Sequence, residues 1–215
     1  MKSSLPEKTG GMTLIIGALL FAAYSSLFLI LLPIANGKSD FAQLVRNPAW
    51  LPLAVTALAG ITLLMLGFYF VHARMRHQSG VLGATGFFFI EAAYFLQGCK
   101  VTWEIFVYPV IAAHTESAFL LADGIIKNDP NVMLYRAIAS LTILAGIVLF
   151  SLAIFRSHRF PPTAPALIFI GAITYAVGPY FSLFLAIGGI FVFAVGCLVL
   201  GVELMRNPSI PDQSQ

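Results

Sequence analysis

Long apolar runs, separated by short polar segments, divide this chain into six stretches. A helix that crosses the hydrocarbon core of a bilayer needs about 20 apolar residues, because the core is about 30 Å thick and each residue adds about 1.5 Å. Lipid offers the backbone no hydrogen-bond partner, so each span must be helical. The pattern therefore predicts an all-α integral membrane bundle of six transmembrane helices, at residues 12–35, 50–71, 81–108, 132–155, 164–177 and 184–205.

The third stretch, Val81–Ala113, is the longest, and as one helix it would measure about 50 Å. This exceeds the thickness of the hydrocarbon core, so we expect a helix that projects beyond the bilayer or kinks near Gly98. We expect it to end within Pro109–His114. The amphipathic segment His114–Asn131 is too short and too acidic to span, which predicts a short interfacial helix between spans three and four.

The remaining segments join the spans. Between spans two and three, a short basic loop is expected to end at Gly80; it contains His72, Arg74, Arg76 and His77. Spans five and six are expected to form a helical hairpin through a tight turn at Gly178–Tyr180. Residues 1–215 then form a single transmembrane domain, with a short flexible tail at 206–215.

Composition agrees with a chain that is solvated by lipid. Only 10% of the residues are charged and 59% are hydrophobic, whereas a soluble domain carries about 25% charged residues. The net charge of +3 does not indicate binding to nucleic acid, because the basic residues lie at the ends of apolar runs and form no patch. Cys99 and Cys197 both lie in apolar segments, which favours buried thiols over a disulfide.

The distribution of Lys and Arg predicts the orientation, because basic residues in short loops stay on the cytoplasmic side. With a cytoplasmic N-terminus, the basic residues divide seven inside to five outside, and an even number of spans places both termini in the cytoplasm. The inside set is Lys2, Lys8, Arg74, Arg76, Arg156, Arg159 and Arg206, and the outside set is Lys38, Arg46, Lys100, Lys127 and Arg136.

Glu91 is the sharpest candidate for a functional residue, because it lies near the middle of the third span. A charge at the bilayer centre costs at least about 2.5–3.5 kcal/mol, so such a residue must face protein or a water-filled cavity. Two interpretations stay open. Glu91 is either a proton-linked or ligand-binding group inside the bundle, or a neutral acid that holds two helices together through a hydrogen bond.

Further polar residues share one broad arc of the same helix at about 100° per residue. They are Tyr94, Gln97, Glu104 and Tyr108, with Lys100 at the edge of the arc. Lys100 and Glu104 are four residues apart and can form an ion pair. Arg136, at the outer start of span four, can pair with Glu104, Asp129 or Asp123, or can simply anchor that helix at the headgroups.

No catalytic residue, metal site or cofactor is predicted. His72 and His77 are five residues apart, which is off the spacing that a helical metal site needs. No histidine lies in the middle of a span, which argues against a haem held by two histidines. An outer metal site at His114 and Glu116 is a weak alternative.

The second half of the chain resembles a broad group of small bacterial multi-spanning membrane proteins that are classed as domains of unknown function. The resemblance rests on WEIFVYP at 103–109, on LFSLAIFRSHRFPPTAPALIFIGAI at 149–173 and on the closing hairpin, and it covers about residues 80–205. In that group an E-x-F-x-x-P segment closes the third span. The resemblance implies a bacterial cytoplasmic (inner) membrane protein and no particular activity.

Three functions remain open. The absence of a catalytic constellation favours a non-enzymatic bundle that binds a lipid, a small apolar ligand, a partner membrane protein or a second copy of the chain. The first alternative is a small proton-linked carrier or channel that uses Glu91. The second is a membrane enzyme with an outer-face site around Glu104, His114 and Glu116.

Overall fold

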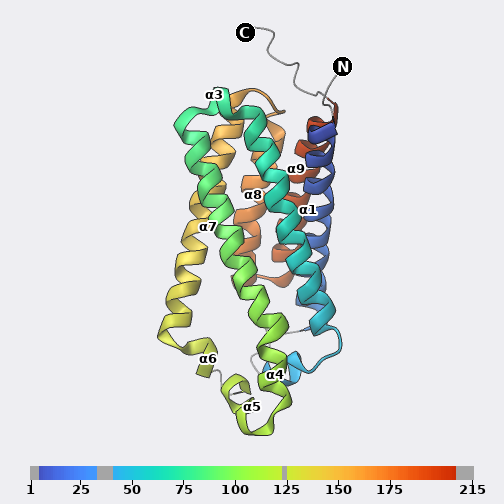
Figure 1. The fold of residues 1–215 in the computed structure, drawn as a ribbon, viewed down its shortest axis with the longest axis vertical. Coiled ribbons are helices and arrows are strands. Elements are labelled where there is room, and N and C mark those ends of the chain that lie inside the picture. The colour runs from blue at the N-terminus through green and yellow to red at the C-terminus, as the bar shows by residue number, and fades with distance from the viewer. Residues whose placement is uncertain (1–4, 33–40, 123–124, 207–215) are drawn as a thin grey trace.

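The computed structural model describes residues 5–32, 41–122 and 125–206, and every regular element in these ranges is helical. The all-α prediction is therefore confirmed. In chain order the elements are α1 (Leu5–Leu31), α2 (Phe41–Val45), α3 (Trp50–Phe106), α4 (Tyr108–Ala113), α5 (Thr115–Ala122), α6 (Ile125–Asn128), α7 (Pro130–Ser157), α8 (Thr163–Val177), the 3-10 turn η2 (Gly178–Tyr180) and α9 (Leu183–Arg206) (Figure 1).

By length and composition, four helices in the described residues are candidate membrane spans, whereas the sequence pattern predicts six spans. They are Glu7–Leu31, Trp50–Ala113, Pro130–Ser157 and Leu183–Arg206. The count differs because predicted spans two and three lie in one continuous 64-residue stretch, and because the apolar helix α8 has only 15 residues.

Gly80 divides α3 into two antiparallel arms, which we call the first arm (50–79) and the second arm (81–106) (Figure 1). Gly80 has φ 52° and ψ −143°, a conformation that a side chain would strain. The basic segment before it, predicted as a loop, is helical through Ser79, and the reversal is confined to the glycine. The rings of Phe68 and Tyr94 then stack across the hairpin, with centroids 5.9 Å apart.

Neighbouring helices approach closely at glycines. A Cβ on Gly86 of the second arm would lie 2.6 Å from the backbone nitrogen of Phe150 in α7, and one on Gly146 would lie 2.7 Å from that of Ile90. Small residues let backbones approach in lipid, where dispersion and not water release favours association. The first arm packs against α1, which packs against α9, which in turn packs against α8.

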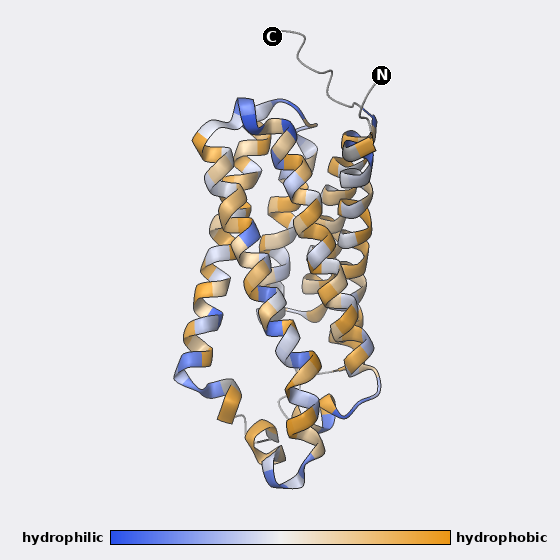
Figure 2. Ribbon diagram, viewed as in Figure 1, coloured by the Kyte–Doolittle hydropathy of each residue, from blue (hydrophilic) through white to orange (hydrophobic). Residues whose placement is uncertain are grey.

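The core runs along the bundle axis between these helices, and the outward faces remain apolar. Phe68, Phe150 and Ile190 are among the buried residues, whereas Phe88, Leu141 and other large apolar side chains are exposed on the outside. Hydrophilic residues gather at the two ends of the bundle and along the second arm of α3 (Figure 2). Apolar side chains thus line both the inside and the outside of the bundle, as in a protein surrounded by lipid.

Basic residues at the end near the termini make contacts that fasten the helices together. Arg74 donates a hydrogen bond from Nη1 to the backbone oxygen of Glu203 (2.9 Å), and its guanidinium lies 5.1 Å from the ring centroid of Phe160. With the Gln78 amide oxygen turned toward it, Arg159 donates to that oxygen from Nη2 at 2.6 Å.

The opposite end is built from short helices. The second arm stays helical through Gly98, so the kink expected there is absent, and it ends at Phe106. The short helix α4 continues to Ala113 with Pro109 in its first turn, so the helical stretch ends within the predicted Pro109–His114. The predicted single interfacial helix is instead two short ones, α5 and α6. The carboxylate of Asp129 caps α7 by accepting from the backbone nitrogen of Asn131 at 2.8 Å. Apart from Arg206, which ends α9, the predicted tail lies outside the described residues.

The glycine contact between α3 and α7 yields a stability prediction. Gly86→Ala places a methyl group against the α7 backbone, so we expect the free energy of unfolding in detergent to fall by about 1–3 kcal/mol, the usual cost of overpacking. Gly188→Ala is the matched control, because a Cβ there meets nothing within 4 Å. That control is expected to be neutral or slightly stabilising, and equal thermal midpoints for both variants would contradict the packing.

Candidate functional site

The first turns of α7 stand away from α3. Most residues between Asn131 and Ile138 are exposed, and Ala139 is the first buried residue of this helix. The Tyr135 hydroxyl spans the gap by donating to the backbone oxygen of Leu96 in the second arm. The two helices therefore touch at a tyrosine here, whereas further along they pack backbone to backbone at Gly86 and Gly146.

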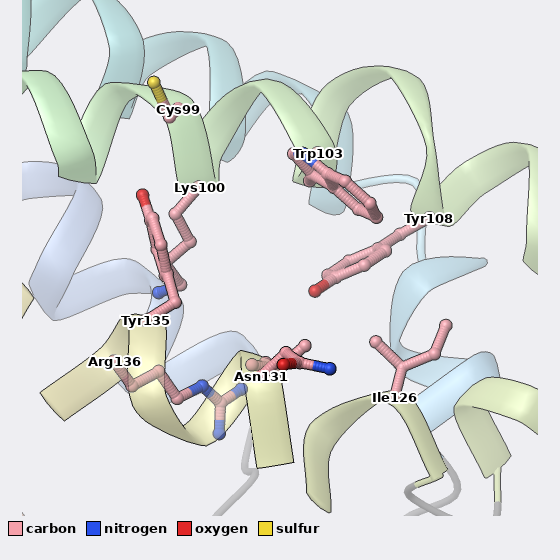
Figure 3. Close-up of a pocket in the computed structure, with 9 residues that line it drawn as sticks. Cys99, Lys100, Trp103, Tyr108, Ile126, Asn131, Tyr135 and Arg136 are labelled. Atoms are coloured by element: carbon pink, nitrogen blue, oxygen red, sulfur yellow. The ribbon is translucent and has the colours of Figure 1, made fainter. Parts of the chain in front are cut away.

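A cavity of about 250 Å³ lies in this gap, and we call it the outer cavity. Figure 3 shows side chains from α3 and α4 on one side of it and from α6 and α7 on the other. The lining is mostly apolar and aromatic, with two cations and one amide. It consists of Cys99, Lys100, Trp103, Tyr108, Ile126, Asn131, Val132, Tyr135 and Arg136.

A second cavity of about 140 Å³, the inner cavity, adjoins the first. Its lining includes four residues of the outer cavity, Lys100, Tyr108, Ile126 and Arg136, together with Phe28, Phe41, Trp50, Glu104 and Leu121. Aromatic rings enclose it, with centroid distances of 5.7 Å between Phe28 and Trp50 and 5.8 Å between Phe41 and Tyr108. The shared lining makes the two cavities one site with an inner and an outer part.

Glu104 is the one acid that lines this site within the described residues, and it is only 4% exposed. Its Oε1 lies 3.3 Å from Nζ of Lys100, which confirms the predicted ion pair. Its backbone oxygen accepts from the indole Nε1 of Trp50 at 2.8 Å. Its Oε2 is buried and has no hydrogen-bond partner among the described residues. The site thus contains a buried carboxylate with one acceptor oxygen unused.

Arg136 is exposed at the boundary of the two cavities. Among the described residues it forms no ion pair with Glu104 or with Asp129, two of the predicted partners. The third predicted partner, Asp123, lies outside the described residues. The guanidinium is therefore available to a ligand.

The predicted polar arc divides into two groups. Lys100, Glu104 and Tyr108 come together in the site with Arg136, whereas Glu91, Tyr94 and Gln97 line neither cavity. Tyr94 is 2% exposed, and its ring belongs to the core, where it stacks on Phe68. Glu91 is half-buried, and its Oε1 has no hydrogen-bond partner within the described part of the chain.

Sequence reasoning missed the aromatic lining, because its members come from separate elements. Phe28 lies in α1, Phe41 in α2 and Tyr135 in α7. Trp50, which begins α3, is 2% exposed and donates from its indole nitrogen to the backbone oxygen of Glu104. The excess of aromatic residues at one end of several apolar runs was the only signal, and an interfacial belt produces the same pattern.

The described residues contain no group of three or more His, Cys, Asp or Glu side chains that could hold a metal ion. His114 and Glu116 are exposed on and beside α5, and neither lines a cavity of the site. His114 and Glu116 thus share neither cavity with Glu104, the third residue of the expected outer-face enzyme site.

No family model, curated protein or solved structure matches this chain.

Proposed function

We propose that this chain is an integral membrane protein that crosses the bilayer six times. Both arms of α3 then span, and α8 is the short fifth span. The arm 50–79 would be about 45 Å long, which is more than enough to span, whereas α8 would be about 22 Å long. To span, α8 needs either a locally thin bilayer or a continuation of the helical path through η2. The apolar outer faces and the hydrophilic ends of the bundle support this assignment.

The proposed orientation puts both termini in the cytoplasm of a bacterial cell. The arginines assigned to the inside lie at the end of the bundle where α9 ends: Arg206 ends α9, and Arg74 bonds to Glu203 of α9. Arg159, just after Arg156 in the last turn of α7, contacts Gln78, which is close to Arg76. The site lies at the other end, where Lys100 is paired with Glu104 and Asp129 caps α7. Because Lys and Arg are enriched in cytoplasmic loops, their excess at the end where α9 ends favours a cytoplasmic position for that end.

Single cysteines test this topology in a Cys99→Ser/Cys197→Ala background. We expect a membrane-impermeant maleimide to label Glu116→Cys and Tyr180→Cys in intact cells, because both positions are exposed and proposed to lie outside. His77→Cys, exposed beside Gly80, should react only after the membrane is opened. Labelling of Tyr180→Cys from the cytoplasmic side alone would contradict a spanning α8.

The function that we propose is binding of a membrane amphiphile in the site, without catalysis. The outer cavity carries the proposal: it is about 250 Å³, mostly apolar, and bordered by the unpaired cation of Arg136. Pockets of this kind, with apolar walls and a few polar groups, are typical of ligand sites between helices. The linings of the two cavities contain no histidine, and their one acid, Glu104, is paired with Lys100, which supports binding over catalysis.

A lipid with a photoreactive acyl chain tests binding in proteoliposomes. We expect saturable cross-links that map to residues 99–103 and 131–136, and we expect unlabelled lipid to suppress them. Val132→Trp fills the outer cavity and should reduce these cross-links about tenfold, whereas Leu134→Trp, on an exposed position of the same helix outside the lining, should not. Cross-links spread evenly over all exposed apolar faces would contradict a specific site.

A proton-linked carrier is the second candidate, and the buried, unpartnered Oε1 of Glu91 favours it. Proteoliposomes with an internal pH dye distinguish the two candidates. A carrier or channel would dissipate an imposed pH gradient, and Glu91→Gln, which keeps the side-chain shape, would abolish that flux. The binding proposal expects the same slow leak as in protein-free vesicles, with and without the substitution.

A further inference from the structure

The inner cavity has the chemistry of a site for an organic cation. The rings of Phe28, Phe41, Trp50 and Tyr108 line it, and the Phe41 and Trp50 centroids are 5.6 Å apart. Faces of aromatic rings attract ammonium groups, most strongly where water is excluded. Trp50 is held in place by the hydrogen bond from its indole nitrogen to Glu104, so this wall is preorganised.

The carboxylate of Glu104 supplies the negative charge for such a cation. Its side chain is almost fully buried, its Oε1 pairs with Lys100, and its Oε2 has no partner among the described residues. A buried charged acceptor without a donor is costly, and an ammonium N–H that binds there removes the cost. A primary ammonium carries three such donors, whereas a quaternary one carries none.

Cations occupy the boundary between the two cavities. Lys100 and Arg136 line both, and Arg136 has no ion pair in the part of the chain that the structure describes. Arginine beside the amide of Asn131 is suited to a phosphate group, which accepts hydrogen bonds from both. A ligand that satisfies the whole site must therefore be positive at its inner end, negative at the boundary and apolar in the outer cavity.

We infer that the site selects a zwitterionic phospholipid with a primary ammonium headgroup, an inference that rests on the proposed amphiphile binding. The ammonium group lies in the inner cavity at Glu104, and the phosphate lies between Lys100 and Arg136. An acyl chain follows the outer cavity, the pocket drawn in Figure 3, past Trp103. The inner cavity of about 140 Å³ is close in size to a protein cavity of about 150 Å³ that holds benzene. An ethylammonium group has fewer heavy atoms than benzene, so the inner cavity is large enough for it.

Competition against a fluorescent phosphatidylethanolamine tests this selectivity on the purified full-length protein. The competitors are phosphatidylethanolamine, phosphatidylcholine and phosphatidylglycerol with identical acyl chains, together with glycerophosphoethanolamine as the soluble headgroup. We expect phosphatidylethanolamine to compete about tenfold better than phosphatidylglycerol, with phosphatidylcholine weaker than phosphatidylethanolamine. The soluble headgroup should compete only weakly, because it lacks the acyl chain; competition as strong as that of the lipid would make a free headgroup the ligand and overturn the lipid assignment.

Substitutions at Glu104 and at Phe41 test whether the inner cavity produces the headgroup preference. Glu104→Gln should remove the preference for phosphatidylethanolamine while some binding through Arg136 persists, and Glu116→Gln, an exposed acid outside both linings, should leave it unchanged. If Glu104→Gln fails to fold, Phe41→Leu removes one aromatic face and should reduce the same preference.

The outcomes separate this inference from the proposed function. Equal competition by phosphatidylglycerol, or an unchanged preference in Glu104→Gln and in Phe41→Leu, overturns the headgroup assignment and leaves amphiphile binding intact. Equal competition by phosphatidylcholine overturns the primary ammonium. Absence of any saturable lipid binding overturns the proposed function and this inference with it.

Discussion

The backbone reversal at Gly80 is the constraint on which the rest of the structure depends. Without it, the 57 residues of α3 would form one helix far longer than the bilayer is thick. With it, the two arms run side by side, and Trp50 reaches a backbone oxygen that is 54 residues away in the sequence. Both the aromatic wall of the inner cavity and the position of Glu104 follow from this contact.

The site exists because the packing of α7 against α3 changes along its length. Near Gly86 and Gly146 the two backbones touch, and no space remains between them. Toward Pro130 no such glycine contact is present among the described residues, and Tyr135 holds the helices apart while bonding across the gap. Close packing at one end and a tyrosine spacer at the other leave the outer cavity between them.

The sequence predicted the helices well, because lipid solvation leaves a strong pattern of apolar runs. The final helix, expected at 184–205, is observed at Leu183–Arg206. The pattern could not reveal that the basic segment before Gly80 stays helical. The chain reverses at one glycine with positive φ, and the sequence does not distinguish that glycine from any other. The ion pair of Lys100 with Glu104 was predictable because both residues lie on one helix at a spacing of four.

The rest of the site was beyond the sequence, because it is assembled by tertiary packing. Phe28 and Phe41 meet Trp50 only after α1, α2 and α3 have come together. Glu91, Tyr94 and Gln97 lie in the same broad arc of the helix as Glu104, yet that arc meets different neighbours along its length: core rings at Tyr94 and the cavities at Glu104. Helical periodicity predicts which residues share a face, but not which part of that face borders a cavity.

Disulfide cross-linking across the two arms of α3 tests the hairpin most directly. A Cβ on Gly98 would lie 4.0 Å from Cγ2 of Ile61, so Ile61→Cys/Gly98→Cys in a background without native cysteines should oxidise to an intramolecular disulfide in native membranes. Ile61→Cys/Gly188→Cys, which pairs the first arm with an exposed glycine of α9, is the control that should stay reduced. Failure of the first pair to cross-link, or equal cross-linking of both pairs, would contradict the reversal at Gly80 and the site that depends on it.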